Sequence, residues 1–222
     1  MPFSEPITLL MVSRGRPDGF RRAVDSARRL AKHKIHVLSY FDDDDPTLAD
    51  YPEYNVIGPR KYLGKSLLEL LPMVETRFCF LGADDIEFMT QDWDQKLLDA
   101  MPEDELAIVY GSDNEDPKFY CAHFMFSMKW HNLVGLYGPG FHHVHIDQWI
   151  REVGHGVDRV IKVPDVMVKH HHWRTGLAQW DDTYRGTKLR NIDDLNYLRS
   201  TRHIREQHIE TLRKCLSAPT PS

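Results

Sequence analysis

The sequence predicts an α/β fold, in which a mostly parallel central sheet is flanked by helices and followed by a C-terminal helical extension. Two observations lead to this prediction. Short apolar runs alternate with segments of helical periodicity over residues 7–110, and this alternation is typical of parallel sheets covered by helices. Of the 222 residues, 41% are hydrophobic, which is enough to form the core of one ordinary domain.

The first half of the chain supplies the alternating elements. Pro17 favours a helix start, and apolar residues then recur at three- and four-residue spacing up to Ala31. The expected strands are residues 7–12, 35–41, 55–57, 77–81 and 106–110, and the expected helices are 17–31, 63–71 and 93–101.

The second half departs from this alternation. Residues 119–128 are expected to form strands, 128–135 and 146–153 short helices, 160–169 a strand, 191–214 a charged terminal helix, and 217–222 a loose tail.

Charge and composition exclude some classes of protein. The formal net charge of −5 argues against a generally basic nucleic-acid binder. No apolar stretch approaches the roughly 18 residues of a membrane span, and no secretory signal is recognisable. Three widely spaced cysteines favour reduced thiols, so we expect a cytoplasmic protein, or the host cytoplasm if a bacteriophage encodes it.

Three of the expected strands end in polar residues. Ser13, Arg14 and Arg16 follow the first strand, the acidic run 42–45 follows the second, and Asp84-Asp85 follow the fourth. In an open parallel sheet, ligands bind outside the carboxyl ends of the strands. The arginines could contact phosphate, and the carboxylates could accept hydrogen bonds from a ribose or a base. Together these residues would suit a nucleotide ligand.

A nucleotide diphosphate beside Asp84 and Asp85 requires a cation. Like unit charges 4 Å apart repel by about 4 kcal/mol at an effective dielectric of 20, and a divalent ion reverses that sign. Carboxylate and phosphate oxygens suit Mg²⁺ or Mn²⁺. Adjacent Asp residues are also common as turn or cap residues, so the pair has a purely structural interpretation as well.

Histidines and a glycine-rich segment form two further candidate groups. On a strand His170 and His172 share a face, with His171 on the other, and imidazoles bind divalent metals; a surface histidine cluster is the alternative. In GPGFHHVHIDQW, residues 138–149, Asp147 is either the N-cap of a helix or a general base in a cleft.

Taken in order, the segments ITLLMVSRGRPDGF, FLGADDIEF, GLYGPGFHHVHIDQW and VPDVMVKHHH resemble those of GT-A fold glycosyltransferases, close to the family-two-type enzymes. The resemblance covers most of residues 5–175. It implies a GT-A-like catalytic domain over 1–175, with a nucleotide-binding half at 1–112 and an acceptor half at 113–175. Residues 176–216 are then a helical extension and 217–222 a flexible tail.

The resemblance also implies roles for individual residues. Asp85 is the expected metal ligand in a DxD-like motif that lacks an acid at Ala83, and Asp84 would contact the sugar or ribose. His170 or His172 would complete the metal site. Asp147 would be the catalytic base, although Ile146 stands where relatives carry Glu. The expected nucleotide-sugar contacts are Ser13, Arg14, Arg16, Asp43, Asp44, Lys65 and Asp84, with Gly64 nearby.

The function implied is metal-dependent transfer of a sugar from a nucleoside-diphosphate sugar to an acceptor hydroxyl, with retention or inversion left open. The acceptor would be a glycan, a protein or, as in some bacteriophage relatives, a hydroxymethylated DNA base. Trp149, Trp173 and Trp180 are candidate stacking surfaces. Basic residues of the extension would suit a polyanionic acceptor or form a solvated helix face: Arg185, Lys188, Arg190, Arg199, Arg202 and Arg205.

Two other functions fit the same residues. A metal-dependent hydrolase would use the Asp and His groups to activate water against a nucleotide sugar. A non-catalytic nucleotide- or glycan-binding module would use the same strand ends and would tolerate the loss of Asp147.

Overall fold

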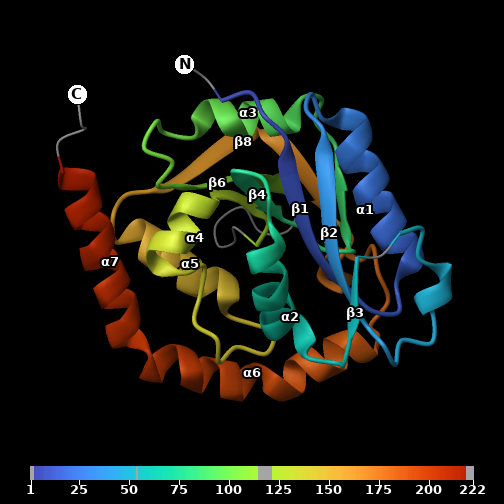
Figure 1. Ribbon diagram of the computed structural model, residues 1–222. Helices are drawn as coiled ribbons and strands as arrows, with labels where there is room; N and C mark the ends of the chain where they lie inside the picture. The colour runs from blue at the N-terminus through green and yellow to red at the C-terminus, as the bar shows by residue number, and fades with distance from the viewer. Residues whose placement is uncertain (1–2, 54, 115–121, 219–222) are drawn as a thin grey trace.

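The computed structural model describes residues 3–53, 55–114 and 122–218. Its centre is one eight-stranded sheet with the strand order β3-β2-β1-β4-β7-β6-β8-β5, which curves through the molecule between two sets of helices (Figure 1). The expected α/β class is thus confirmed.

The N-terminal part of the sheet is parallel. Strand β1 (Ile7–Ser13) lies between β2 (Ile35–Asp42) and β4 (Phe78–Leu81), and β3 (Val56–Gly58) pairs with the outer edge of β2. The carboxyl ends of all four strands therefore lie at one edge of the sheet, as predicted for the strands that end in polar residues.

The remainder of the sheet is mixed, so the expectation of a mostly parallel sheet holds only in part. Strand β7 (Phe124–Ser127) runs antiparallel to both β4 and β6 (Ile108–Asp113), whereas β8 (Val160–His170) is parallel to β6. Strand β5 (Ile86–Phe88), which the sequence pattern did not predict, pairs antiparallel with β8. At three residues it is too short to show an alternating pattern.

Helices pack on both faces of the sheet. Helices α1 (Pro17–Leu30) and α3 (Trp93–Ala100) contribute Phe20 and Trp93 to the core on one face. Helices α2 (Tyr62–Leu70), α4 (Met128–Val134) and α5 (Ile146–His155) cover the other face, with Trp130 and Trp149 fully buried. Side chains alternate along β1, so Leu9 joins the first core and Leu10 the second.

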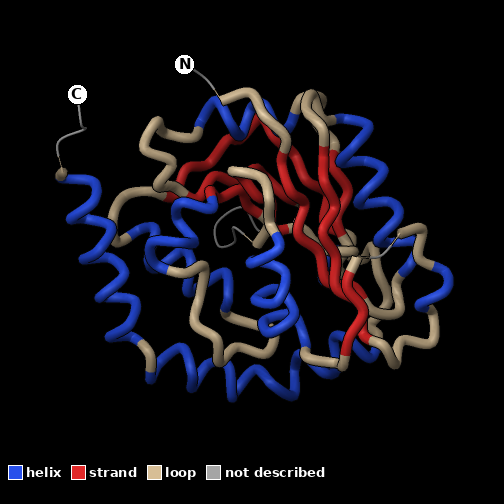
Figure 2. Tube along the Cα trace, viewed as in Figure 1, coloured by secondary structure: helices blue, strands red, loops and turns tan. Residues whose placement is uncertain are grey.

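The C-terminal extension consists of two helices instead of the single one expected. Helix α6 (Asp182–Ser200) and helix α7 (Arg202–Ser217) form the long blue curve along the bottom and left of the view in Figure 2. They meet at Thr201, which has a non-helical conformation. Leu198 and Leu212 are buried in the core beside α4 and α5, so the extension packs on the sheet domain.

Some expectations lie outside the described residues: the strand at 119–121, Cys121, and tail residues 219–222. Cys79 is buried and Cys215 exposed, and neither is in a disulfide. Among the described residues, no helix is long and apolar enough to cross a membrane.

Candidate functional site

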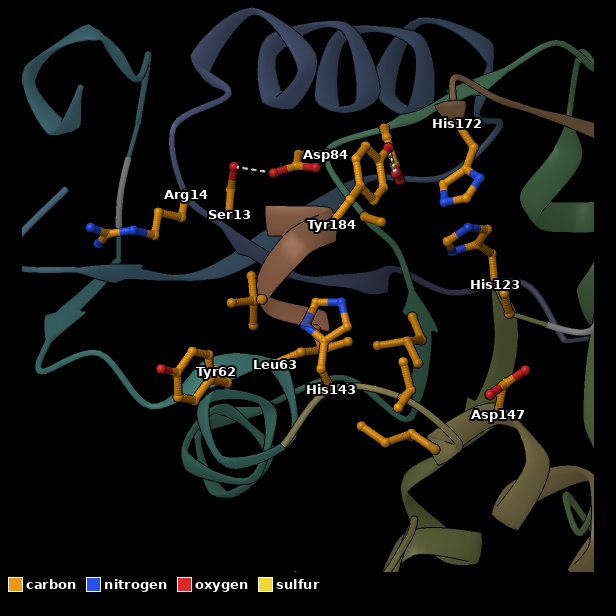
Figure 3. Close-up of a pocket in the computed structure, with 18 of the residues that line it drawn as sticks. Ser13, Arg14, Tyr62, Leu63, Asp84, His123, His143, Asp147, His172 and Tyr184 are labelled. Atoms are coloured by element: carbon orange, nitrogen blue, oxygen red, sulfur yellow. Dashed lines mark hydrogen bonds between the residues drawn. The ribbon is translucent and has the colours of Figure 1, made fainter. Parts of the chain in front are cut away.

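A cavity of about 640 Å³ opens at the carboxyl ends of β1, β2 and β4. Its walls come from those strand ends, from the loop before α5, from the end of β8 and from α6 (Figure 3). The expected site residues that line it are Ser13, Arg14, Arg16, Asp84, Asp85, Asp147, His170 and His172.

Asp84 is held at the bottom of the cavity by the end of β1. Its carboxylate accepts a hydrogen bond from Ser13 Oγ at 2.7 Å and from Arg16 Nη1 at 3.2 Å. Helix α1 approaches closely because residue 19 is glycine, and a Cβ there would lie 2.4 Å from the Asp84 carbonyl oxygen. Burial raises the pKa of Asp84 to about 6, with Arg16 opposing and neighbouring Asp85 reinforcing the rise.

Asp85 faces two histidines. The nearest distance from its carboxylate to His170 Nε2 is 3.4 Å, and the ring centroids of His170 and His123 are 5.0 Å apart. One ligand atom from each of Asp85, His123 and His170 lies within 4.8 Å of the others. Burial acts to raise the pKa of Asp85, but the hydrogen bond and positive charge of His170 outweigh it and hold that pKa below its usual range.

His123 was missed by sequence reasoning. It stands alone immediately before β7, so no spacing pattern connects it with the 170–172 histidines. It reaches Asp85 because β7 runs antiparallel beside β4, whose end leads to the Asp pair. Only the strand pairing could have identified it.

Helix α6 closes one side of the Asp85–His123–His170 cluster, which has the composition of a metal-ligating cluster. The hydroxyl of Tyr184 donates to Asp85 at 3.4 Å, and His172 packs edge-on against the Tyr184 ring with centroids 4.9 Å apart. Arg16 lies over the same ring at 4.7 Å and forms an ion pair with Asp181 at 2.6 Å. The extension therefore supplies walls of the cavity.

The opposite end of the cavity is lined by Arg14, Asp42, Arg60 and Tyr62. Arg14 Nη1 contacts Asp42 at 3.2 Å, and burial raises the pKa of Asp42 against the pull of Arg14. Two guanidinium groups lie near the Tyr62 ring, that of Arg60 at 5.2 Å and that of Arg190 at 3.7 Å from its centroid. Arginines and an aromatic ring around a polar cleft can hold phosphate and a base.

Three residues expected to contact a nucleotide sugar do not line the cavity: Asp43, Asp44 and Lys65. All three side chains are exposed, and Asp44 pairs with Arg14 from outside. Asp42 and Asp45 are the buried carboxylates of this acidic run, and Asp42 lines the cavity. Gly64 packs closely against the backbone of Phe141: a Cβ at residue 64 would lie 2.3 Å from the Phe141 carbonyl oxygen.

Asp147 lies across the cavity from Asp84 (Figure 3). Helix α5 begins at Ile146 after His145, so Asp147 is in the first turn and is not the N-cap. Burial raises its pKa, against backbone N–H groups of the helix start that lower it. A carboxylate with a raised pKa beside an open cavity has the properties of a general base.

The loop that leads to Asp147 is anchored by Asp194 of α6. Its fully buried carboxylate accepts the backbone N–H groups of His142 and His143 at 2.8 Å and of Val144 at 2.9 Å. These bonds hold the Asp194 pKa below its usual value, although burial acts in the other direction. The sequence showed no sign of this role, since Asp194 is one of several charged residues in a helical pattern.

The remaining candidates separate by exposure. Trp149 is buried in the core and does not present a stacking surface, whereas Trp173 and Trp180 are exposed. Among the basic residues of the extension, Arg205 is buried and pairs with Glu152 at 2.7 Å, and Arg202 pairs with Glu206 at 2.9 Å. Arg185, Lys188 and Arg199 of α6 are exposed, and Arg190 is half-buried.

Comparison with known proteins identifies the fold. No protein-family model matches the sequence, and no curated protein sequence matches it. Among solved structures, the mannosyltransferase PcManGT from Pyrobaculum calidifontis, in complex with GDP-Man and Mn²⁺, superposes with a TM-score of 0.57 at 11% identity, covering 97% of this chain and 76% of that one. The chain therefore shares the α/β fold of this mannosyltransferase.

Proposed function

We propose that the protein is a metal-dependent glycosyltransferase, which moves a sugar from a nucleoside-diphosphate sugar to an acceptor hydroxyl. The observation that carries the proposal is the Asp85–His123–His170 cluster beside Asp84, at the strand ends of a fold shared with a mannosyltransferase. A fold alone does not define an activity, so the proposal depends on this cluster.

The cluster fits a divalent cation. One carboxylate and two imidazoles are ordinary ligands for Mn²⁺, and diphosphate oxygens would complete the shell. Asp85, His123 and His170 would hold the ion, and His172, whose ring centroid is 5.0 Å from that of His170, borders it. The bound ion would offset the charge that develops on the departing diphosphate.

The donor would lie along the cavity from Tyr62 towards His172. Arg14 and Asp42 would contact the nucleoside end, where both lie beside Arg60. Asp84, oriented by Ser13 and Arg16, would accept hydrogen bonds from sugar or ribose hydroxyls. Fixed hydrogen bonds of this kind preorganise the site for one geometry of the donor.

Asp147 would deprotonate the acceptor hydroxyl. It faces the cavity from the wall opposite Asp84, so an acceptor that enters between them would present its oxygen to the anomeric carbon. The acceptor would be a glycan, a protein or a hydroxymethylated DNA base.

Thermal unfolding in the presence of nucleotides tests this function. GDP, UDP and ADP and their sugars are added with Mn²⁺ or with a chelator. A ligand at about one hundred times its Kd stabilises by about 2.7 kcal/mol, so at least one nucleotide should raise Tm, and only with the metal. If no nucleotide shifts Tm, the donor site does not exist as described.

A hydrolase built on the same residues remains the second candidate, because Asp147 and the metal-ligating cluster could equally direct a water molecule. Product analysis separates the two. Release of free sugar at an unchanged rate with and without acceptors would indicate the hydrolase. Nucleotide binding without any turnover would indicate a binding module.

A further inference from the structure

Two exposed tryptophans lie next to side chains that line the cavity and form its rim on that side. Trp173 is 38% and Trp180 41% exposed, and their ring centroids are 4.8 Å apart at an interplanar angle of 86°. Large aromatic side chains usually bury most of their surface. Two adjacent ones that are held perpendicular to each other and are partly exposed to solvent form a corner.

The corner is connected directly to the catalytic cavity. The rings of Trp180 and Tyr184 stack with their centroids 5.7 Å apart, and the ring centroids of Trp173 and His172 are also 5.7 Å apart. Both Tyr184 and His172 line the cavity. A group resting on the tryptophans would therefore border the metal-ligating cluster.

The position of this rim matches the acceptor side. Figure 3 shows Arg14 and Tyr62 at one end of the cavity and His172, His123 and Asp147 at the other. The end with Arg14 and Tyr62 is the one assigned above to the nucleoside. A molecule held at the His172 end would approach the sugar that is to be transferred, and would do so near Asp147.

The charges around the corner favour a neutral ligand. Arg174 lies 5.6 Å from the Trp173 ring, and Asp181, next to Trp180 in sequence, is paired with Arg16. Single-stranded nucleic acids are bound by aromatic rings combined with a positively charged groove that follows the backbone. The two arginines and one carboxylate named here, with one of the arginines paired to the carboxylate, do not form such a groove.

We propose that Trp173 and Trp180 form an acceptor platform for a neutral oligosaccharide. The apolar C–H face of a pyranose would stack on one indole, as apolar surface packs on aromatic faces. Among the described residues, neither indole N–H donates a hydrogen bond, so both remain able to bind sugar hydroxyls. The inference rests on the proposed function and specifies its acceptor as a glycan.

The test is direct binding to the full-length chain in the presence of GDP or UDP and Mn²⁺. Neutral gluco-, manno- and galacto-oligosaccharides and an N-acetylglucosamine series are titrated, with calorimetry and tryptophan fluorescence as readouts. At least one series should bind. Trp173→Ala and Trp180→Ala should each weaken that binding by about tenfold, the loss of one stacking contact.

Two kinds of variant control for folding and position. Trp173→Phe and Trp180→Phe keep an aromatic face and should retain most of the affinity. Leu189→Ala removes an apolar side chain that is 78% exposed elsewhere on the extension and should leave oligosaccharide binding unchanged. Circular dichroism and Tm report whether each variant is folded.

Three results would overturn the platform: no binding by any of these oligosaccharides, binding that both alanine variants retain in full, or tighter tryptophan-dependent binding of a single-stranded oligonucleotide. Failure of the proposed function is seen separately, as wild-type protein whose Tm does not respond to any nucleotide with Mn²⁺. Oligosaccharide binding without that response would leave Trp173 and Trp180 as an oligosaccharide-binding surface but would exclude the transferase and, with it, the acceptor role.

Discussion

The carboxylate of Asp194 accepts the backbone N–H of His143 at 2.8 Å, which ties helix α6 to the loop before α5. The two residues are 51 positions apart in sequence. Tyr197, one turn further along α6, packs on the same loop, and a Cβ at Gly140 would lie 2.3 Å from its ring. The extension thus determines where the wall that carries Asp147 lies.

Removing the Asp194 carboxylate should destabilise the protein. Asp194→Ala leaves three backbone N–H groups without their acceptor in a buried position, at a cost of about 3 kcal/mol in the free energy of unfolding. Urea denaturation measures it. The neighbouring Asp193 is exposed, so Asp193→Ala should change stability by less than about 0.5 kcal/mol. Equal effects of the two substitutions would contradict the anchoring role.

Loss of a ligand in the metal-ligating cluster should abolish the Mn²⁺-dependent part of the nucleotide response. Asp85→Ala and His123→Ala are each expected to remove the rise in Tm that Mn²⁺ adds, because two protein ligands hold the ion poorly. His171→Ala is the matched control, since His171 contacts Glu87 at 2.9 Å and does not line the cavity. A His123→Ala protein with a full response would remove His123 from the site.

Asp147→Asn should separate chemistry from donor binding. The amide cannot accept the proton of an acceptor hydroxyl, so kcat should fall by about a hundredfold to ten-thousandfold. The Tm response to nucleotide and Mn²⁺ should stay as in the wild type, because Asp147 lies across the cavity from Asp84. Full turnover by Asp147→Asn would show that Asp147 is not the catalytic base and only places a charge in the first turn of α5.

Stability should fall in mildly acidic solution through His208. His208 lies on α7 and packs against Trp149 of α5. Burial there lowers the pKa of His208. The folded pKa is thus below that of the unfolded chain, so the unfolded chain takes up a proton first as the pH drops below about 6.5. Stability is full above that pH and is lost as the pH falls through the folded pKa.

Urea denaturation at a series of pH values would measure this. His208→Phe should give a shallower loss of stability below pH ~6.5 than the wild type, because the titrating group is gone. His203→Phe, an exposed position on the same helix, should leave the slope as it is. Identical slopes for wild type and His208→Phe would show that His208 does not contribute.

Local sequence patterns determined the parallel half of the fold and the edge at which the cavity opens. The apolar runs that end at Ser13, Asp42 and Leu81 are strands because each is short, buried and followed by polar turn residues. Parallel strands bring those ends to one edge, so the sequence alone predicts that Asp84, Asp85 and Arg16 lie at the same edge of the sheet.

Only the tertiary structure shows which residues, distant in the sequence, strand pairing and helix packing bring together. His123 reaches Asp85 through the antiparallel β4–β7 pair. Through the packing of α6, Asp194 anchors the loop before α5 and Tyr184 lines the cavity. A period of two or 3.6 residues shows which face of an element is apolar, but it does not show which distant element covers that face. The sequence therefore located the Asp pair, and packing selected the side chains around it.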